Sequence, residues 1–193
     1  MPTPERLAKV NRVLSFRQPD LRIVLEQVVN PHNASAVLRT CDAAGVMNIH
    51  VIGSAEEPLP INSAITTRAD KWLSLHHHAG TEECLDRLKE EGFAIAVTHL
   101  GDDSIPYTQM DFTRPTALVF GGEHIGISPQ ALARADAKIR IPMFGMVQSL
   151  NLSVSVGIIL YEAVRQRLSA GLFERPRMDP AELEDYLDRW SDL

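Results

Sequence analysis

Little in this chain points to disulfide, metal or membrane chemistry. Its two cysteines, Cys41 and Cys84, stand far apart and form no CxxC pair, so the sequence signals neither a disulfide framework nor a zinc site. No apolar run is long enough to span a bilayer, and the first twenty residues are charged rather than signal-like. We therefore expect a cytoplasmic protein with no membrane segment and no metal.

Positive charge is also scarce overall, since the 193-residue chain has a formal net charge of -6. Such a balance argues weakly against a nucleic-acid partner. The distribution is uneven, however: five basic and two acidic residues in 1–22 leave a local charge of +3, whereas seven acids and three arginines in 174–193 leave -4. A basic amino-terminal end fits RNA binding, and two solvated terminal helices explain the same charges equally well.

Apolar periodicity predicts strands that alternate with helices between residues 22 and 170. Such alternation is typical of an α/β domain with a mainly parallel sheet flanked by helices. Short helices before and after it give expected units of 1–20, 21–170 and 171–193. Strands are expected over 22–29, 48–52, 72–76, 93–98, 116–120 and 138–141, and helices over 4–16, 33–44, 63–69, 81–92, 151–170 and from Ser128-Pro129 and Asp179-Pro180 onward.

Two details of this pattern concern helix starts and ligand sites. Asn33 to Ser35 are expected to cap one helix and Thr81 another, because Asn, Ser and Thr side chains satisfy free backbone N–H groups there. Ligands of parallel sheets sit beyond the carboxyl ends of the strands. The loops after Thr98, Phe120 and Ile141 are therefore the expected site.

Several familiar kinds of site are not matched by the sequence. The run from His76 to His78 does not indicate a metal site, because successive strand residues point to opposite faces and no carboxylate follows at ligand spacing. No GxSxG elbow is present and Ser149 has no histidine nearby in sequence, so hydrolase chemistry is not indicated. The segment GGEHIG matches neither a dinucleotide fingerprint nor a phosphate-binding loop.

Three stretches carry more glycine or polar residues than their local structure requires. In PHNASAVLRTCDAAG (31–45), Arg39 has apolar neighbours and needs an acceptor, for which an ion pair with Asp42 or another carboxylate is the purely structural explanation. In VFGGEHIGIS (119–128), two glycines directly after a strand let the backbone approach a ligand and present Glu123, although tight packing explains them equally well.

The third stretch is IRIPMFGMVQSLNLSVSVGIILYEAVRQR (139–167), where a strand, an apolar loop and a long helix follow one another. One polar residue is enough to cap that helix, at about 1 kcal/mol, yet Gln148, Ser149, Asn151 and Ser153 all gather at its start. The loop is therefore predicted to be buried and functional.

In this order the three stretches resemble the motifs of the SPOUT class of RNA 2'-O-methyltransferases. With RQPDL (17–21), DFTRPTALVFG (111–121) and RQRLSAGL (165–172), the chain is similar to the TrmH family of tRNA guanosine-2'-O-methyltransferases. The resemblance implies an α/β fold with a carboxy-terminal trefoil knot, a homodimer with the active site between subunits, and S-adenosylmethionine bound in the knot. It also implies methylation of the guanosine at position 18 in the tRNA D-loop.

The resemblance also assigns roles to individual residues. Arg39 is the implied catalytic residue, with Asn33, Glu123, Ser149, Asn151 and Ser153 placing it, the cofactor or the RNA. His124 stands where the family pattern has Lys. The implied cofactor-binding residues are Thr98, His99, Leu100, Gly121, Gly122, Ile141, Met146 and Leu150, and the implied RNA-binding residues are Arg6, Lys9, Arg12, Arg17, Arg165 and Arg167.

Methyl transfer from a sulfonium is an in-line displacement, which requires an aligned ribose oxygen and removal of its proton. A guanidinium stays protonated in proteins and is a poor base. We therefore expect Arg39 to stabilise the developing alkoxide and to orient a phosphate, while the proton leaves through phosphate or water.

Two other functions remain open at this point. One is the same reaction on another RNA, either ribosomal RNA or the tRNA wobble nucleotide. The other is a non-catalytic α/β domain that binds RNA or a small molecule.

Overall fold

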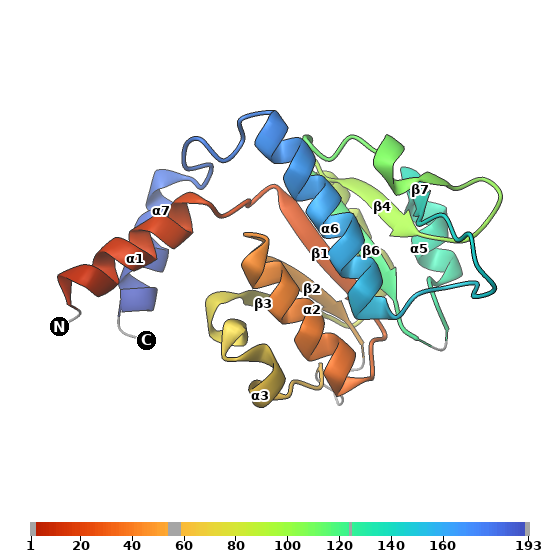
Figure 1. Ribbon diagram of the computed structural model, residues 1–193, viewed down its shortest axis with the longest axis horizontal. Coiled ribbons are helices and arrows are strands. Elements are labelled where there is room, and N and C mark those ends of the chain that lie inside the picture. Colours follow the sequence, from red (N-terminus) through yellow and green to blue (C-terminus); the bar gives the residue numbers. More distant parts are fainter. Residues whose placement is uncertain (1–2, 54–58, 124, 192–193) are drawn as a thin grey trace.

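The computed structural model describes residues 3–53, 59–123 and 125–191. Within them, seven strands form one sheet in the order β3-β2-β1-β6-β4-β7-β5, and every pairing is parallel (Figure 1). The α/β class and the parallel sheet are thus confirmed. The strands are β1 (Leu21–Glu26), β2 (Asn48–Ile52), β3 (Ser74–His78), β4 (Ala94–Thr98), β5 (Ile105–Pro106), β6 (Thr116–Gly121) and β7 (Ala137–Arg140).

Helices lie on both faces of the sheet. None of those in the described ranges is long and apolar enough to cross a membrane. They are α1 (Pro4–Ser15), α2 (Pro31–Ala43), α3 (Ser63–Thr66), α4 (Thr81–Glu90), α5 (Pro129–Arg134), α6 (Leu152–Ser169) and α7 (Pro180–Ser191), with 3-10 helices η1 (Ala69–Trp72) and η2 (Tyr107–Gln109).

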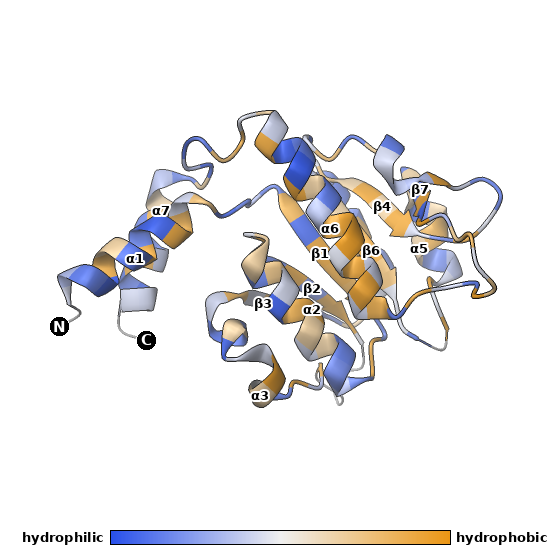
Figure 2. Cartoon of the chain, viewed as in Figure 1, coloured by the Kyte–Doolittle hydropathy of each residue, from blue (hydrophilic) through white to orange (hydrophobic). Residues whose placement is uncertain are grey.

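The central strands are apolar on both sides, as expected for a parallel sheet covered on both faces. In β1, Ile23 and Leu25 belong to the apolar cluster under α2 and α6, whereas Val24 belongs to the cluster under α4 and α5. Figure 2 shows hydrophobic residues concentrated on the strands and on the amino-terminal half of α6. This packing fixes the helix starts at the carboxyl edge of the sheet, where the site is expected.

The two terminal helices pack against each other beside the sheet domain (Figure 1). Val10 and Leu14 of α1 form a buried cluster with Tyr186 and Trp190 of α7, joined by Met47. The buried apolar residues of the last helix therefore pack on the first helix. This explains why amphipathic helices at opposite ends of the sequence are both ordered.

Several expected boundaries differ from the structure. The helix expected over 33–44 begins at Pro31, because the side chain of Asn30 accepts the backbone N–H groups of His32 and Asn33 at 2.9 and 3.3 Å. Thr81 is not a cap either: the cap position is Gly80, and the Thr81 hydroxyl donates to a buried carboxylate of β1. Strand β3 lies two residues later than expected, and the two-residue strand β5 was not expected from the sequence.

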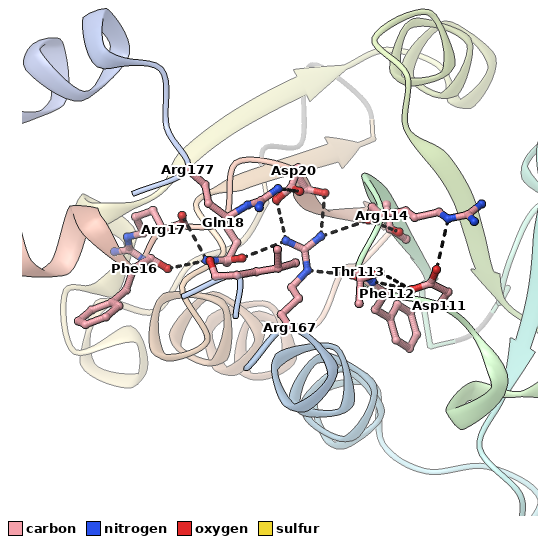
Figure 3. A network of polar contacts seen from close by, with 12 residues as sticks. Phe16, Arg17, Gln18, Asp20, Asp111, Phe112, Thr113, Arg114, Arg167 and Arg177 are labelled. Carbon is pink, nitrogen blue, oxygen red and sulfur yellow. Dashed lines mark hydrogen bonds and ion pairs between the residues drawn. The ribbon is translucent and has the colours of Figure 1, made fainter. Parts of the chain in front are cut away.

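Arg167, an expected RNA-binding residue, lies in the interior with 0% exposure. Its guanidinium donates to Oδ1 of Asp20 at 2.6 Å and to Oε1 of Gln18 at 3.0 Å. It also donates to the backbone carbonyls of Phe112 and Arg114, at 2.9 and 3.2 Å (Figure 3). These partners precede β1 and β6, so Arg167 ties α6 to the amino edge of the sheet. The prediction that this side chain contacts RNA is therefore wrong.

Arg17 is also buried, at 1% exposure. Its guanidinium donates to Oδ1 of Asp42 at 2.5 Å and lies 5.1 Å from the ring centre of Trp190. The prediction that Arg17 contacts a phosphate of the RNA is therefore wrong as well. The carboxylate of Asp42 pairs with Arg17, and no ion pair joins it to Arg39.

Candidate active site

Three side chains from distant parts of the sequence form a hydrogen-bonded chain at the carboxyl edge of the sheet. Asn33 lies in the first turn of α2, Glu123 follows β6, and Asn151 caps α6. Nδ2 of Asn33 donates to Oε1 of Glu123 at 2.5 Å, and Nδ2 of Asn151 donates to Oδ1 of Asn33 at 2.9 Å. The three implied motifs therefore meet at one place.

The orientation of the two side-chain amides follows from the backbone N–H group at one end of this series of hydrogen bonds. The backbone N–H of Ser153, 2.8 Å from Asn151, can only donate, so Oδ1 of Asn151 must face it. The amide group of Asn151 then faces Asn33, and that of Asn33 faces Glu123. Every donor in the chain points toward Glu123, which keeps its carboxylate an acceptor at the opening of the site.

Two glycines hold Glu123 against the end of β1. A Cβ on Gly121 would lie 2.1 Å from the backbone of Gly126, and a Cβ on Gly122 would lie 2.1 Å from the carbonyl oxygen of Gln27. Both positions therefore require glycine for close backbone packing. Gln27 itself has a φ of +54°, a left-handed conformation that is unusual for this residue type.

A buried carboxylate supports the same loops, and sequence reasoning missed it. Glu26, 1% exposed, accepts the backbone N–H of Ser128 at 2.9 Å and its hydroxyl at 2.6 Å. It also accepts the hydroxyl of Thr81. Glu26 thus joins the starts of α4 and α5 to the end of β1. An acidic residue that ends a buried strand is the signal that could have identified it.

A cavity of about 710 Å³ opens beyond the carboxyl ends of β4, β6 and β7. Glycine backbone and apolar side chains form much of its wall, and Glu123 and Asn151 stand on its border. Seven of the eight implied cofactor-binding residues line it: Thr98, His99, Leu100, Gly121, Gly122, Ile141 and Leu150.

The eighth, Met146, does not line this cavity and is 100% exposed. Met143 lines the cavity on that loop instead. Phe144 and Val147 are also exposed, at 97% and 62%, so the prediction of a buried loop is wrong for the single chain. Apolar composition indicated burial, and the loop instead presents its apolar side chains outward.

The sequence model of the SpoU rRNA methylase family matches residues 20–161, well over half of the chain. The chain belongs to this family. A tRNA (guanosine(18)-2'-O)-methyltransferase of Thermus thermophilus is 46% identical to this SpoU family member over 188 residues, which cover 97% of this chain and 96% of that protein.

Solved structures agree with this assignment. The crystal structure of the A. aeolicus TrmH/SpoU tRNA modifying enzyme matches with a TM-score of 0.92 and 41% identity, and the match covers 97% of this chain and 95% of that chain. An AdoMet-bound rRNA methyltransferase from Sinorhizobium meliloti matches with a TM-score of 0.66 and 31% identity, over 80% of this chain and 59% of that one. The fold of this SpoU family member is thus one found in RNA methyltransferases.

Not every implied site residue of the SpoU family member joins the hydrogen-bonded chain. Arg39 is exposed, and its side chain forms no hydrogen bond or ion pair with any residue that the structure describes. It lies six residues after Asn33 on α2, about 9 Å further along the helix axis. Ser149 lines the cofactor-sized cavity. His124 lies outside the described residues.

The implied RNA-binding residues divide in the same way. Lys9 and Arg12 are exposed on α1, whereas Arg6 is half-buried and donates to the backbone carbonyl of Trp190 at 3.2 Å. Arg165 is exposed and paired with Glu162 at 2.7 Å. Four of the six positions therefore stay accessible or partly accessible, while Arg17 and Arg167 do not.

Proposed function

We propose that this protein transfers the methyl group of S-adenosylmethionine to the ribose 2'-oxygen of guanosine 18 in tRNA. The observation that carries the proposal is the hydrogen-bonded chain from Asn151 through Asn33 to Glu123, which ends at a cavity in the loops after β4, β6 and β7. The relatives named for this reaction match almost the whole chain.

The cavity suits the proposed cofactor. Its volume of about 710 Å³ lies within the usual range of small-molecule sites, roughly 300–1,000 Å³. The backbone around Thr98, Gly121 and Ile141 offers N–H and C=O groups to a nucleoside, and Leu100 and Leu150 offer apolar surface. When bound, S-adenosylmethionine supplies a methyl group on a positively charged sulfur.

The residues of this chain would then align the acceptor and stabilise the charge that develops on it. The ribose oxygen would accept the methyl group that the cofactor supplies, and its proton would leave through a phosphate or water. Glu123, held as an acceptor by Asn33, orients the ribose hydroxyl. Arg39 stabilises the developing negative charge on the oxygen and orients the neighbouring phosphate.

Within one copy of the protein, Arg39 lies outside the hydrogen-bonded series of Asn151, Asn33 and Glu123. This supports a homodimer with the site between two copies. Exposed apolar residues on α6 and the loop before it offer an interface: Val154, Tyr161 and Leu168 are 48%, 51% and 58% exposed, beside Phe144 and Met146. Sedimentation equilibrium at micromolar protein should give twice the chain mass, and a monomer contradicts this part of the proposal. The trefoil knot, the three expected units and the cytoplasmic location stay predictions.

The direct test is to incubate unmodified tRNA transcripts with the protein and labelled S-adenosylmethionine, then to map the labelled nucleotide. We expect label on the ribose of guanosine 18. Label at the wobble nucleotide, or label only in a parallel incubation with ribosomal RNA, would give the substrate of the alternative reaction. Absence of both cofactor binding and label would favour a non-catalytic RNA-binding domain.

A further inference from the structure

A second cavity adjoins the proposed cofactor cavity. It has a volume of about 1150 Å³ and lies beyond the carboxyl ends of β1, β2 and β3. Both cavities are lined by Glu123 and Ile125, so they meet at the residue where the ribose is proposed to bind. In a nucleotide the base is attached one carbon from the 2'-position. A ribose beside Glu123 therefore brings its base to the second cavity when its hydroxyl faces the first.

The charges of the second cavity exclude one kind of ligand group and favour another. Among its described lining residues, the only charged side chains are acidic: Glu82, Glu83 and Glu123. A phosphate would be repelled there, whereas a group that presents N–H donors would be attracted. Apolar residues such as Val28, Ile52 and Leu59 line other parts of the wall and can cover the faces of a base.

The three carboxylates are not equally available. Glu82 pairs with Arg134 at 2.9 Å, and Glu123 accepts from Asn33. Glu83 is exposed and forms no hydrogen bond or ion pair with any described residue. It is the acidic side chain of this cavity with both oxygens free.

A neutral side chain with an amide group lines the same cavity as Glu83. Glu83 lies in the first turn of α4 and Gln130 in the first turn of α5, and these two helices pack side by side. Both helices follow parallel strands and start at the same edge of the sheet. Gln130 also lines the cavity, and its side chain has no hydrogen-bond partner among the residues that the structure describes.

We propose that the second cavity holds the base of the target nucleotide and that Glu83 determines selectivity for guanine. This proposal rests on the proposed function and adds the residues that read the base. The Glu83 carboxylate accepts the N1–H and the N2 amino group of guanine, and the Gln130 amide donates to O6. Adenine presents an unprotonated N1 at that edge, which a carboxylate repels.

The test compares two tRNA transcripts that differ only at position 18, one with guanine and one with 2-aminopurine, which lacks both O6 and the N1–H. The full-length protein is assayed for kcat/KM on each, as wild type, Glu83→Ala and Glu82→Ala. Glu82 is the matched control, because it is adjacent, equally charged and lines the same cavity. Calorimetry of S-adenosylmethionine binding shows that each variant keeps its cofactor site.

We expect Glu83→Ala to lower kcat/KM on the guanine transcript about 10- to 100-fold, the usual effect of one bidentate base contact. The ratio of guanine to 2-aminopurine activity should fall at least about 10-fold relative to wild type, while Glu82→Ala keeps the wild-type ratio. An unchanged ratio in Glu83→Ala overturns the proposal, even where overall activity falls. Absence of methylation by wild type overturns the proposed function and this inference together.

Discussion

The two edges of the sheet use polar side chains in opposite ways. At the amino edge, Arg167 is completely buried and all its bonds go to protein groups, among them Asp20 and Gln18. At the carboxyl edge, the donors of Asn151 and Asn33 all point toward Glu123, which opens onto two cavities. The comparison distinguishes two kinds of polar group. Buried groups whose hydrogen bonds are all satisfied within the protein stabilise the fold. Groups that can still form hydrogen bonds are available to bind ligands.

The largest effect on stability is expected at Arg167. Arg167→Met leaves Asp20 with one cationic partner fewer and removes the donors to the backbone carbonyls of Phe112 and Arg114. Removing one partner of a buried ion pair costs about 3–5 kcal/mol, so the free energy of unfolding should fall by that amount in urea titrations. Arg165→Met, two residues earlier and exposed, is the control and should change it by about 0.5 kcal/mol or less. Equal effects of the two changes would contradict the structural role of Arg167.

A comparably large effect on activity is expected at Arg39, with no loss of stability. Arg39→Ala removes an exposed side chain without partners among the described residues, so thermal unfolding should stay unchanged. Loss of one stabilising donor in a transition state typically lowers kcat about 100- to 1,000-fold. Single-turnover rates on tRNA measure this loss.

The protonation role of Arg39 has its own test. Arg39→Lys keeps a positive charge and should restore part of the rate without moving the pH profile of single-turnover methylation. A profile that shifts with the lysine pKa would show instead that the residue at position 39 is the base.

A smaller effect is expected from pH at the amino edge. Burial alone would raise the pKa of Asp20, but its hydrogen bonds and ion pairs with Arg167 and Arg177 outweigh burial and lower it below its usual value. The stability from this pair is therefore present above the ordinary Asp pKa, near 4, and is lost as the pH falls through the folded-state value. Asp20→Asn should be less stable than wild type at pH 7, with the gap narrowing in acid unfolding experiments. A gap independent of pH would contradict this account.

The smallest effect is expected on RNA binding by α1. Lys9→Ala and Arg12→Ala each remove an exposed positive charge. Each change should reduce the slope of the logarithm of the tRNA binding constant against the logarithm of the salt concentration by about 0.9 or less. Arg189→Ala on α7, already paired with Asp185, is the control. Identical slopes in all three variants would show that Lys9 and Arg12 of α1 do not contact the RNA.

Local signals were sufficient for much of the fold. Periodicity indicated most strands, and Ser128-Pro129 marked the start of α5, where Ser128 accepts the backbone N–H of Ala131 at 3.1 Å. Asn151 was expected near the start of α6 and caps it. These features depend on neighbours a few residues away, so the sequence displays them directly.

Long-range contacts were not readable from local sequence. The burial of Arg17 and Arg167 depends on partners 25 and 147 residues away, and a positive charge alone looks like a surface residue. Apolar composition likewise made the loop around Phe144 look buried, although it is exposed in the single chain. Glu26, whose buried carboxylate supports the loops of the site, was missed. The three groups that donate to it come from the starts of two helices later in the sequence.

The most direct test of the contrast between the two edges is the single-turnover methylation rate of Asn33→Ala at saturating tRNA and S-adenosylmethionine. Asn33 lines neither cavity and donates to Glu123, so its proposed role is to orient that carboxylate. We predict a fall in rate of roughly 100-fold with unchanged cofactor affinity. A rate equal to that of wild type would show that the hydrogen-bonded chain at the carboxyl edge takes no part in the chemistry.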